Sequence, residues 1–260
     1  MNFSPPWTHS GKRIESAIRK ALYDFKLIEN GTALSIALSG GKDSITLLIM
    51  LKAILGKGFP HLPLYAIHIA GAFSCGASLY QGYLKGICDQ LEVPLIIKES
   101  TQTLESLACY RCSRERRRLI FEAAKEVNAP LIAFGHHEDD TIQTLLMNLL
   151  HKGEFAGNLP KVPMHDYAVT IIRPMLYVPE ETIHVFAEQQ GFLRQTCQCP
   201  VGQKSKRMEV KTIIKELEES FPNAKRNLAL AALNYGSTKA LSSTKQSSEL
   251  SRATTMDALP

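Results

Sequence analysis

A short run of small, charged and hydroxyl residues lies between two apolar segments near the start of the chain. It has the sequence SGGKDS at positions 39–44, between the apolar run 34–38 and the apolar-periodic run 45–55. This pattern predicts a strand that ends in a tight turn and opens directly into a helix. Adjacent glycines let the backbone approach a bulky anion. The first N–H groups of a helix have no internal partner and carry the positive end of its dipole. With two hydroxyls and one ammonium beside them, these amides form a cradle for phosphate.

The spacing within this run excludes two other phosphate loops. A Walker A loop needs Gly-x-x-x-x-Gly-Lys-Ser/Thr, whereas position 36 is Ile and Lys42 is followed by Asp43. The dinucleotide fingerprint Gly-x-Gly-x-x-Gly is also absent here. The run instead resembles the pyrophosphate loop of the ATP-pyrophosphatase (PP-loop) superfamily, whose members cleave ATP to AMP and pyrophosphate and use the AMP to activate a carbonyl. The alternative is an ordinary Gly-Gly turn between a strand and a helix.

Composition limits the class of protein. The chain has 260 residues and 45% hydrophobic content, which is enough to bury one sizeable core with a small appendage. No apolar run approaches the ~20 residues of a membrane span, and residues 1–10 lack the pattern of a secretory signal. Six cysteines without an export signal favour thiols or metal ligation in the cytoplasm. The formal charge of +5 suits a phosphate-rich partner without requiring one.

Strand-like runs alternate with helical patterns along most of the chain. This rhythm predicts an α/β fold with a doubly wound, parallel, five-stranded sheet and helical additions at both ends. The loop over 153–166 is rich in Gly and Pro. The predicted strands are 32–38, 63–70, 94–98, 130–134 and 168–173. The predicted divisions are an N-terminal helical segment 1–30, an ATP-binding α/β domain 31–191, a C-terminal helical extension 192–235 that carries the last two cysteines, and a disordered tail 236–260.

Three candidate segments each follow a predicted strand. They are the run 39–44, the stretch 135–140 and the Arg173-Pro174 step. In parallel α/β sheets, ligands collect at the carboxyl ends of the strands, so these segments should share one edge and form a nucleotide site. Acidic residues there are candidates to hold Mg²⁺, although helix-start capping is the alternative for Asp139 and Asp140.

The cysteines form a second constellation. Cys109 and Cys112 make a C-x-x-C pair just before a predicted helix, which suits a zinc half-site, an iron–sulfur half-site or a redox pair. Cys197 and Cys199 supply one or two further thiols. Three ligands would leave a coordination position open for chemistry, whereas four thiols would make a structural zinc site. Cysteines without any metal are the remaining alternative.

Four motifs in order resemble the tRNA 2-thiocytidine synthetase (TtcA) family. They are SGGKDS, C-x-x-C-S-R-x-R-R at 109–117, G-H-H-x-D-D-x-x-Q-T at 135–144, and I-R-P at 172–174. The resemblance runs from about residue 12 to 235. It implies an ATP-dependent tRNA sulfurtransferase in which ATP and Mg²⁺ activate the C2 carbonyl of an anticodon-loop cytidine, which then receives sulfur. A 4Fe–4S cluster bound by the C-x-x-C pair and one later thiol is implied as well.

The resemblance also implies partners and site residues. The partners are tRNA and a sulfur donor system with a cysteine desulfurase; no membrane is involved, and a homodimer is one candidate assembly. Beside a cluster and a nucleotide, we expect Arg116 to stabilise charge at the reacting carbonyl and most of Arg111, Arg114 and Arg118 to contact tRNA phosphates, with a solvated basic face as the alternative. The residues implied for the nucleotide are Ser39, Gly40, Gly41, Lys42, Asp43, Ser44, Gly135, His136 and Arg173; those for catalysis are Asp43, Asp139, Asp140 and Arg116; those for the metal are Cys109, Cys112, Cys197 and Cys199.

Two departures from the family pattern stand out. The later thiol usually belongs to a C-x-x-C before Gly-Ser-Gln, but here a C-x-C precedes the sequence PVGQ at 200–203, so the ligand is Cys197 or Cys199. The second strand usually ends in Asp, whereas this chain has Ala70. Two rival functions use fewer of the motifs: a PP-loop ligase of the tRNA(Ile)-lysidine synthetase type, and a non-catalytic nucleotide-binding module with structural zinc.

Overall fold

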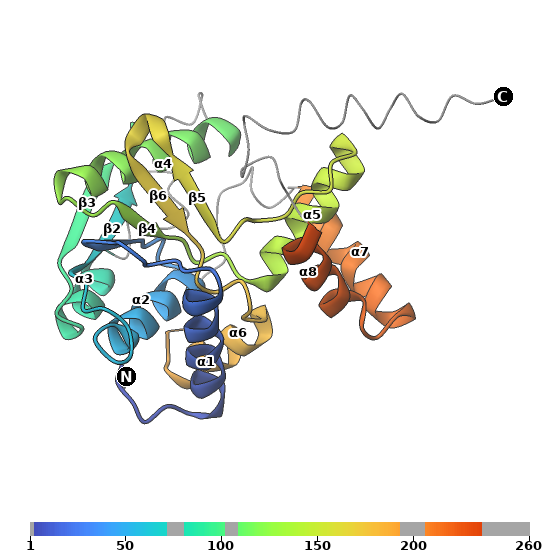
Figure 1. Ribbon diagram of the computed structural model, residues 1–260, viewed down its shortest axis with the longest axis horizontal. Coiled ribbons are helices and arrows are strands. Elements are labelled where there is room, and N and C mark those ends of the chain that lie inside the picture. Colours follow the sequence, from blue (N-terminus) through green and yellow to red (C-terminus); the bar gives the residue numbers. More distant parts are fainter. Residues whose placement is uncertain (1–2, 72–80, 102–108, 193–205, 236–260) are drawn as a thin grey trace.

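The computed structural model describes residues 3–71, 81–101, 109–192 and 206–235 (Figure 1). Its strands form one sheet in the order β3-β2-β1-β4-β6-β5. The strands are β1 (Leu34–Ala37), β2 (Leu64–Ala70), β3 (Leu95–Glu99), β4 (Leu131–Ala133), β5 (Lys161–Met164) and β6 (Val169–Ile172). The helices are α1 (His9–Asp24), α2 (Lys42–Ile54), α3 (Gln81–Gln90), α4 (Cys109–Glu126), α5 (Glu138–Lys152), α6 (Glu180–Gln189), α7 (Lys206–Ser220) and α8 (Ala224–Tyr235), with a 3-10 turn, η2, at His165–Tyr167.

Five strands of the sheet are parallel, which confirms the predicted fold class. The sixth strand, β5, was expected to be part of a loop, and the five-strand count was therefore wrong. It pairs antiparallel with β6 at the edge of the sheet. Pro163 lies within β5, opposite Thr170. Proline cannot donate a ladder hydrogen bond and is tolerated at an edge, so this short strand carries no clear strand pattern in the sequence.

The strand order reverses direction between β1 and β4. From β1 the chain adds β2 and then β3 on one side, whereas β4 and β6 lie on the other side. Ligands bind in α/β sheets at such a switch point, beside the carboxyl ends of the strands. We call the edge where the parallel strands end the carboxyl rim.

Helices cover both faces of the sheet, as Figure 1 shows. On one face α2 packs between the sheet, α1 and α6, and its residues 44–51 are all buried. A helix that is apolar on all sides belongs inside the protein, which explains its weak amphipathic pattern. On the other face α4 packs against β2, β3, β4 and β6 through a separate apolar cluster around Phe121. The phosphate-loop helix is therefore held inside the larger core.

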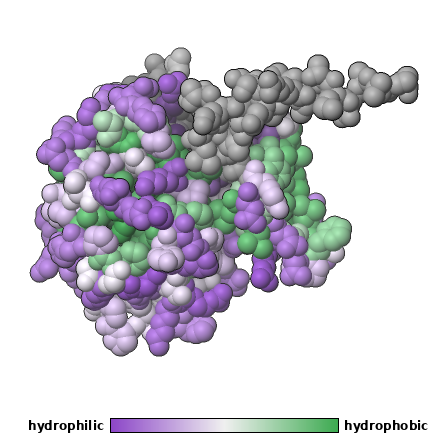
Figure 2. Space-filling view, viewed as in Figure 1, coloured by the Kyte–Doolittle hydropathy of each residue, from purple (hydrophilic) through white to green (hydrophobic). Residues whose placement is uncertain are grey.

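Helices α5, α7 and α8 form a helical lobe beside the sheet (Figure 1). Its small core contains Ile142 and Leu146 of α5, Val210 and Ile214 of α7, and Ala229 of α8. Figure 2 shows that apolar residues also reach the surface over this lobe, where Leu150 is 61% exposed.

The predicted division of the chain at residues 30, 191 and 235 stays a prediction, and the tail 236–260 lies outside the described residues. None of the described helices has the length and apolarity that crossing a membrane requires.

Aromatic packing ties the N-terminal segment to α6. The fully buried ring of Phe186 meets Trp7 edge-on at a centroid distance of 5.9 Å, and it meets Phe192 at the same distance. Phe186→Ala should therefore lower the free energy of unfolding by roughly 3–5 kcal/mol, because a large cavity forms where the rings meet. Urea denaturation followed by circular dichroism measures this change. The neighbouring Val185→Ala, at a surface position, is the control and should cost less than about 1 kcal/mol; equal losses would contradict the packing argument.

Candidate functional site

The phosphate loop, residues 39–44, connects the end of β1 to the start of α2. Gly40 has a φ of +89°, a conformation that residues with side chains rarely adopt. Ser39 and Ser44 close the loop: the Ser44 hydroxyl accepts from the Ser39 amide at 3.2 Å and donates to the Gly41 carbonyl at 3.0 Å. Gly41 caps α2 without a side chain, so the first amides of the helix stay open to an anion. The loop thus has the backbone cradle and hydroxyls that a phosphate chain requires.

The end of β4 presses directly against this loop. A Cβ atom on Gly135 would lie 3.1 Å from the backbone C of Asp43 and 3.1 Å from the N of Ser44. Only a glycine permits this approach without displacing the start of α2. The contact brings the stretch 135–140 alongside the phosphate loop at the switch point.

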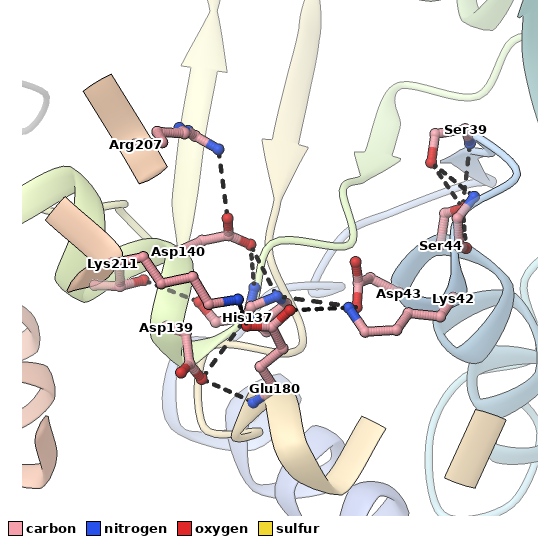
Figure 3. A network of polar contacts seen from close by, with 12 residues as sticks. Ser39, Lys42, Asp43, Ser44, His137, Asp139, Asp140, Glu180, Arg207 and Lys211 are labelled. Atoms are coloured by element: carbon pink, nitrogen blue, oxygen red, sulfur yellow. Dashed lines mark hydrogen bonds and ion pairs between the residues drawn. The ribbon is translucent and has the colours of Figure 1, made fainter. Parts of the chain in front are cut away.

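Lys42 points from the phosphate loop toward two carboxylates. Its Nζ lies 2.9 Å from Asp43 Oδ1 and 3.1 Å from Glu180 Oε1. Burial alone lowers the pKa of Lys42, but the charges and hydrogen bonds of Asp43 and Glu180 outweigh burial and raise it. Figure 3 shows that the lysine side chain extends away from Ser39 and Ser44 toward the start of α6. Lys42 is therefore an ion-pair partner at the side of the cradle.

The first turn of α5 carries three acidic residues, of which Asp139 and Asp140 have different surroundings. The Asp139 side chain is only 8% exposed, forms an ion pair with Lys225 of α8, and accepts a 2.7 Å hydrogen bond from the Glu180 amide. Asp140 accepts from the backbone N of His137 at 3.1 Å and lies 3.5 Å from Arg207 of α7. Asp139 is thus saturated by partners that join α5, α6 and α8, while Asp140 closes the capping box of α5.

His137 is buried among these carboxylates. Its Nε2 lies 3.4 Å from Asp140 Oδ2 and 3.9 Å from Asp43 Oδ1. Across the described ranges 3–71, 81–101, 109–192 and 206–235, no three His, Cys, Asp or Glu side chains are arranged to hold a metal ion by themselves. The ring of His137 therefore lies between carboxylates of α2 and α5.

His136 and Arg173 form a hydrogen-bonded pair at the same rim. Arg173 donates from Nε to His136 Nδ1 at 3.1 Å and from a terminal nitrogen to the Leu159 carbonyl at 2.5 Å. Burial, aided by the charge of Arg173, lowers the pKa of His136 to about 3. Burial followed by the charge of Arg117 lowers the pKa of Arg173 to about 10. The histidine is neutral at ordinary pH and accepts the guanidinium hydrogen bond.

Helix α4 begins at the carboxyl rim as well. Glu115, in its first turns, accepts hydrogen bonds from the backbone N and the hydroxyl of Thr101, which follows the end of β3. Burial is the main cause of the lowered pKa of His68, and the positive charge of Arg116 contributes to it. His68 in turn lies 2.8 Å, at Nδ1, from the carbonyl of Leu38, the residue before the phosphate loop. The segment that carries Cys109 and Cys112 therefore lies on the same rim as the loop.

The structure brings residues 39–44, Gly135, His136 and Arg173 to one rim, and further charged residues lie beside them. Cys197 and Cys199 lie outside the described residues. Arg118 forms an exposed pair with Glu122, and Lys206 pairs with Glu209. Sequence analysis missed Glu180, Lys211 and Lys225, which pair with residues of the site. The acidic start of α6 was the only local signal for Glu180, and the two lysines lie on charged helices without a distinguishing pattern.

The buried His136 makes stability depend on pH. Its pKa is about 3 in the folded chain and about 6.5 in an unfolded chain. Below about pH 6.5 the unfolded state binds the extra proton, so the free energy of unfolding should fall by about 1 kcal/mol per pH unit. In urea denaturation at pH 7.5 and 5.5, wild type should lose about 1 kcal/mol more than His136→Asn. An equal loss in both proteins would show that this histidine does not titrate as its burial requires.

Comparison with known proteins gives a family for this site. A family model described as a PP-loop domain matches residues 10–195. Two curated relatives, from Syntrophotalea carbinolica and Geobacter metallireducens, are both named tRNA-cytidine(32) 2-sulfurtransferase. The first is 33% identical over 225 residues, which cover 84% of this chain and 86% of the relative. The second is 34% identical over 231 residues, which cover 86% and 90%.

A solved structure has the same fold. The U34-tRNA thiolase NcsA from Methanococcus maripaludis, solved with its 4Fe–4S cluster, matches with a TM-score of 0.69 at 24% identity. The match covers 86% of this chain and 77% of that chain. At this level of identity it supports the fold. The family model and the curated relatives show more, and they confirm what the motifs indicated: the chain is an enzyme of the tRNA 2-thiocytidine synthetase family of PP-loop ATP pyrophosphatases.

Proposed function

We propose that the chain replaces the C2 oxygen of a cytidine in the tRNA anticodon loop with sulfur, at the expense of ATP. The observation that carries this proposal is the shared rim: the phosphate loop and the stretch 135–140 are in contact at Gly135 beside the switch point, and α4 begins after the carboxyl end of β3 on the same edge of the sheet. The printed names of relatives that match most of the chain specify cytidine 32 of tRNA and sulfur transfer. The geometry of the rim and the names of the relatives both support sulfur transfer to a tRNA cytidine.

The chemistry explains why a phosphate cradle is needed. A carbonyl oxygen is a poor leaving group, so it first attacks the α-phosphate of ATP, and pyrophosphate departs. Sulfur at the sulfide level then bonds to C2, and the oxygen leaves with AMP, so this substitution needs no oxidant or reductant. Backbone amides and hydroxyls of residues 39–44 would stabilise the departing pyrophosphate, since they are fixed in place before the charge develops. Arg173 and Arg116 supply positive charge near the reacting groups.

Magnesium would accompany the nucleotide. Mg²⁺ is usually held by one or two carboxylates together with substrate phosphates. Asp43, whose side chain is 30% exposed beside the phosphate loop, and Asp140, at 16%, retain access to such an ion. Asp139 was proposed with them from the sequence; its ion pair with Lys225 and its hydrogen bond from the Glu180 amide favour the capping and anchoring role instead.

The cysteines would hold a 4Fe–4S cluster through Cys109, Cys112 and either Cys197 or Cys199. Held by three thiolates, such a cluster would keep one iron available to an exchangeable ligand, which is the chemistry it would supply for sulfur transfer. The position of α4 at the carboxyl rim supports this assignment, because it brings the C-x-x-C segment to the edge where the nucleotide binds. tRNA would contact the arginines of α4 and Arg207. A cysteine desulfurase as sulfur source, a homodimer and a cytoplasmic location stay predictions.

Two substitutions should separate the cluster from the nucleotide. Cys112→Ser should abolish the visible absorption of anaerobically purified protein and reduce tRNA thiolation at least about 100-fold, while ATP binding persists. Gly40→Val should abolish ATP binding but leave the visible absorption intact. Valine rarely adopts a φ of +89°, so this substitution should distort the phosphate loop. Absorption spectroscopy, calorimetric titration with ATP, and mass spectrometry of tRNA nucleosides are the three measurements. Loss of both properties in both variants would argue against two separable sites.

The later thiol can be assigned by paired variants. If one cysteine alone completes the cluster, either Cys197→Ser or Cys199→Ser should remove the absorption and the other should retain it. Anaerobic metal analysis separates the rival functions at the same time. Stoichiometric zinc in a colourless protein would favour a nucleotide-binding module, and ATP/pyrophosphate exchange with tRNA but without thiolation would favour a ligase of the lysidine synthetase type.

A further inference from the structure

The ammonium of Lys42 is shared by two carboxylates beside the phosphate loop. Asp43 is its sequence neighbour, but Glu180 comes from the start of α6, far along the chain. The side chains of Lys42 and Glu180 are 19% and 26% exposed, so water screens this pair only in part. Figure 3 shows Lys42 and Glu180 converging next to His137.

Glu180 is also attached to the helical lobe. Its second carboxylate oxygen lies 3.0 Å from Nζ of Lys211 on α7. Its backbone N donates to Asp139, which pairs with Lys225 of α8. One carboxylate therefore joins the lysine of the phosphate loop to α7, while its own backbone is fixed by α5. Burial on its own raises the pKa of Glu180, but the hydrogen bonds and charges of Lys211 and Lys42 lower it to about 2, so the group is ionised at neutral pH.

We propose that the carboxylate of Glu180 pairs with Lys42 when no nucleotide is bound and competes with the phosphate chain of the nucleotide for this lysine. When phosphate takes Lys42, the ion pair between Glu180 and Lys211 of α7 becomes stronger. This inference rests on the proposed function only in taking residues 39–44 as the site of the nucleotide's phosphates. It assigns Glu180 as a positioning residue, since it acts through the two lysines. No step of the reaction requires Glu180 itself.

Phosphate binding would exchange the partner of Lys42, from the Glu180 carboxylate to a phosphate oxygen. A lysine ammonium sits on a flexible four-carbon stem, so Lys42 can turn from a carboxylate to a phosphate oxygen at small cost. Phosphate chains carry more charge than one carboxylate and attract the ammonium more strongly. When Lys42 leaves, Glu180 keeps Lys211 as its side-chain partner, and that pair strengthens because the carboxylate is no longer shared. Phosphate binding should therefore tighten the hold on α7, and by linkage a tighter α7 should favour phosphate binding.

Binding of inorganic pyrophosphate to the full-length protein tests the competition. Calorimetric titration should show that Glu180→Gln binds pyrophosphate about three- to fivefold more tightly than wild type, because Lys42 no longer has to leave a charged partner. Glu181→Gln removes the same charge one residue away, at an exposed position on the first turn of α6, and should change the affinity by less than about twofold. In a Lys42→Gln background, Glu180→Gln should have no further effect.

Two results would overturn the inference. Unchanged or weaker pyrophosphate binding by Glu180→Gln would show that the carboxylate does not compete. An undiminished gain in the Lys42→Gln background would show that Glu180 acts by general repulsion of anions. Hydrogen exchange gives a second readout, since pyrophosphate should slow exchange along α7 in wild type but not in Glu180→Gln.

The same titrations separate this inference from the proposed function. If wild type binds pyrophosphate and ATP but Glu180→Gln behaves like wild type, the inference is overturned and the proposed function stands. If wild type binds neither, the phosphate site itself is refuted. If binding follows the expected pattern while tRNA receives no sulfur, the competition is supported and the thiolation proposal fails.

Discussion

The close approach of Gly135 to the first turn of α2 is the constraint on which the rest of the site depends. A Cβ atom at position 135 would lie only 3.1 Å from the backbone of Asp43 and Ser44, so the segment after β4 packs directly against the phosphate loop. β1 and β4 are direct neighbours in the sheet, so their carboxyl ends leave side by side. The two motifs meet because the strand order reverses there, and a side chain at position 135 would separate them.

Around that contact, cations from α7 and α8 of the helical lobe offset the negative charge of the site. Acidic groups from α2, α5 and α6 gather beside the phosphate loop, and on their own they would repel phosphate there. The helical lobe supplies the compensating cations: Arg207 and Lys211 from α7 and Lys225 from α8. Removing one member of such a partly buried pair leaves the other uncompensated, so lobe and site depend on each other. The lobe therefore contributes charge to the candidate site as well as packing against it.

Local patterns predicted the parts of this structure that local chemistry determines. The glycines of the phosphate loop, the acidic start of α5 and the five parallel strands each have a pattern in consecutive residues, and all were expected. β5 was missed because Pro163 and the surrounding glycines have the composition of a loop. Glu180 was missed for another reason: its importance comes from Lys42 and Lys211, and no spacing in the sequence reveals that a distant helix start faces a loop. Charge pairs between distant segments require the fold before they can be recognised.

The departure at Ala70 can be understood in the same physical terms. Ala70 is fully buried at the end of β2, where a carboxylate would need a nearby cation to offset its desolvation. Two residues earlier, the fully buried His68 lies 2.8 Å from the Leu38 carbonyl through Nδ1. As a neutral ring it can donate a proton there and so tie the end of β2 to the residue that precedes the phosphate loop. A neutral hydrogen bond thus positions this side of the loop, and the negative charge that the family usually has at the end of β2 is absent. An anion beside the loop would consequently be repelled less from this side, and the carboxylates of Asp43 and Glu180, which approach the loop, are both paired with Lys42.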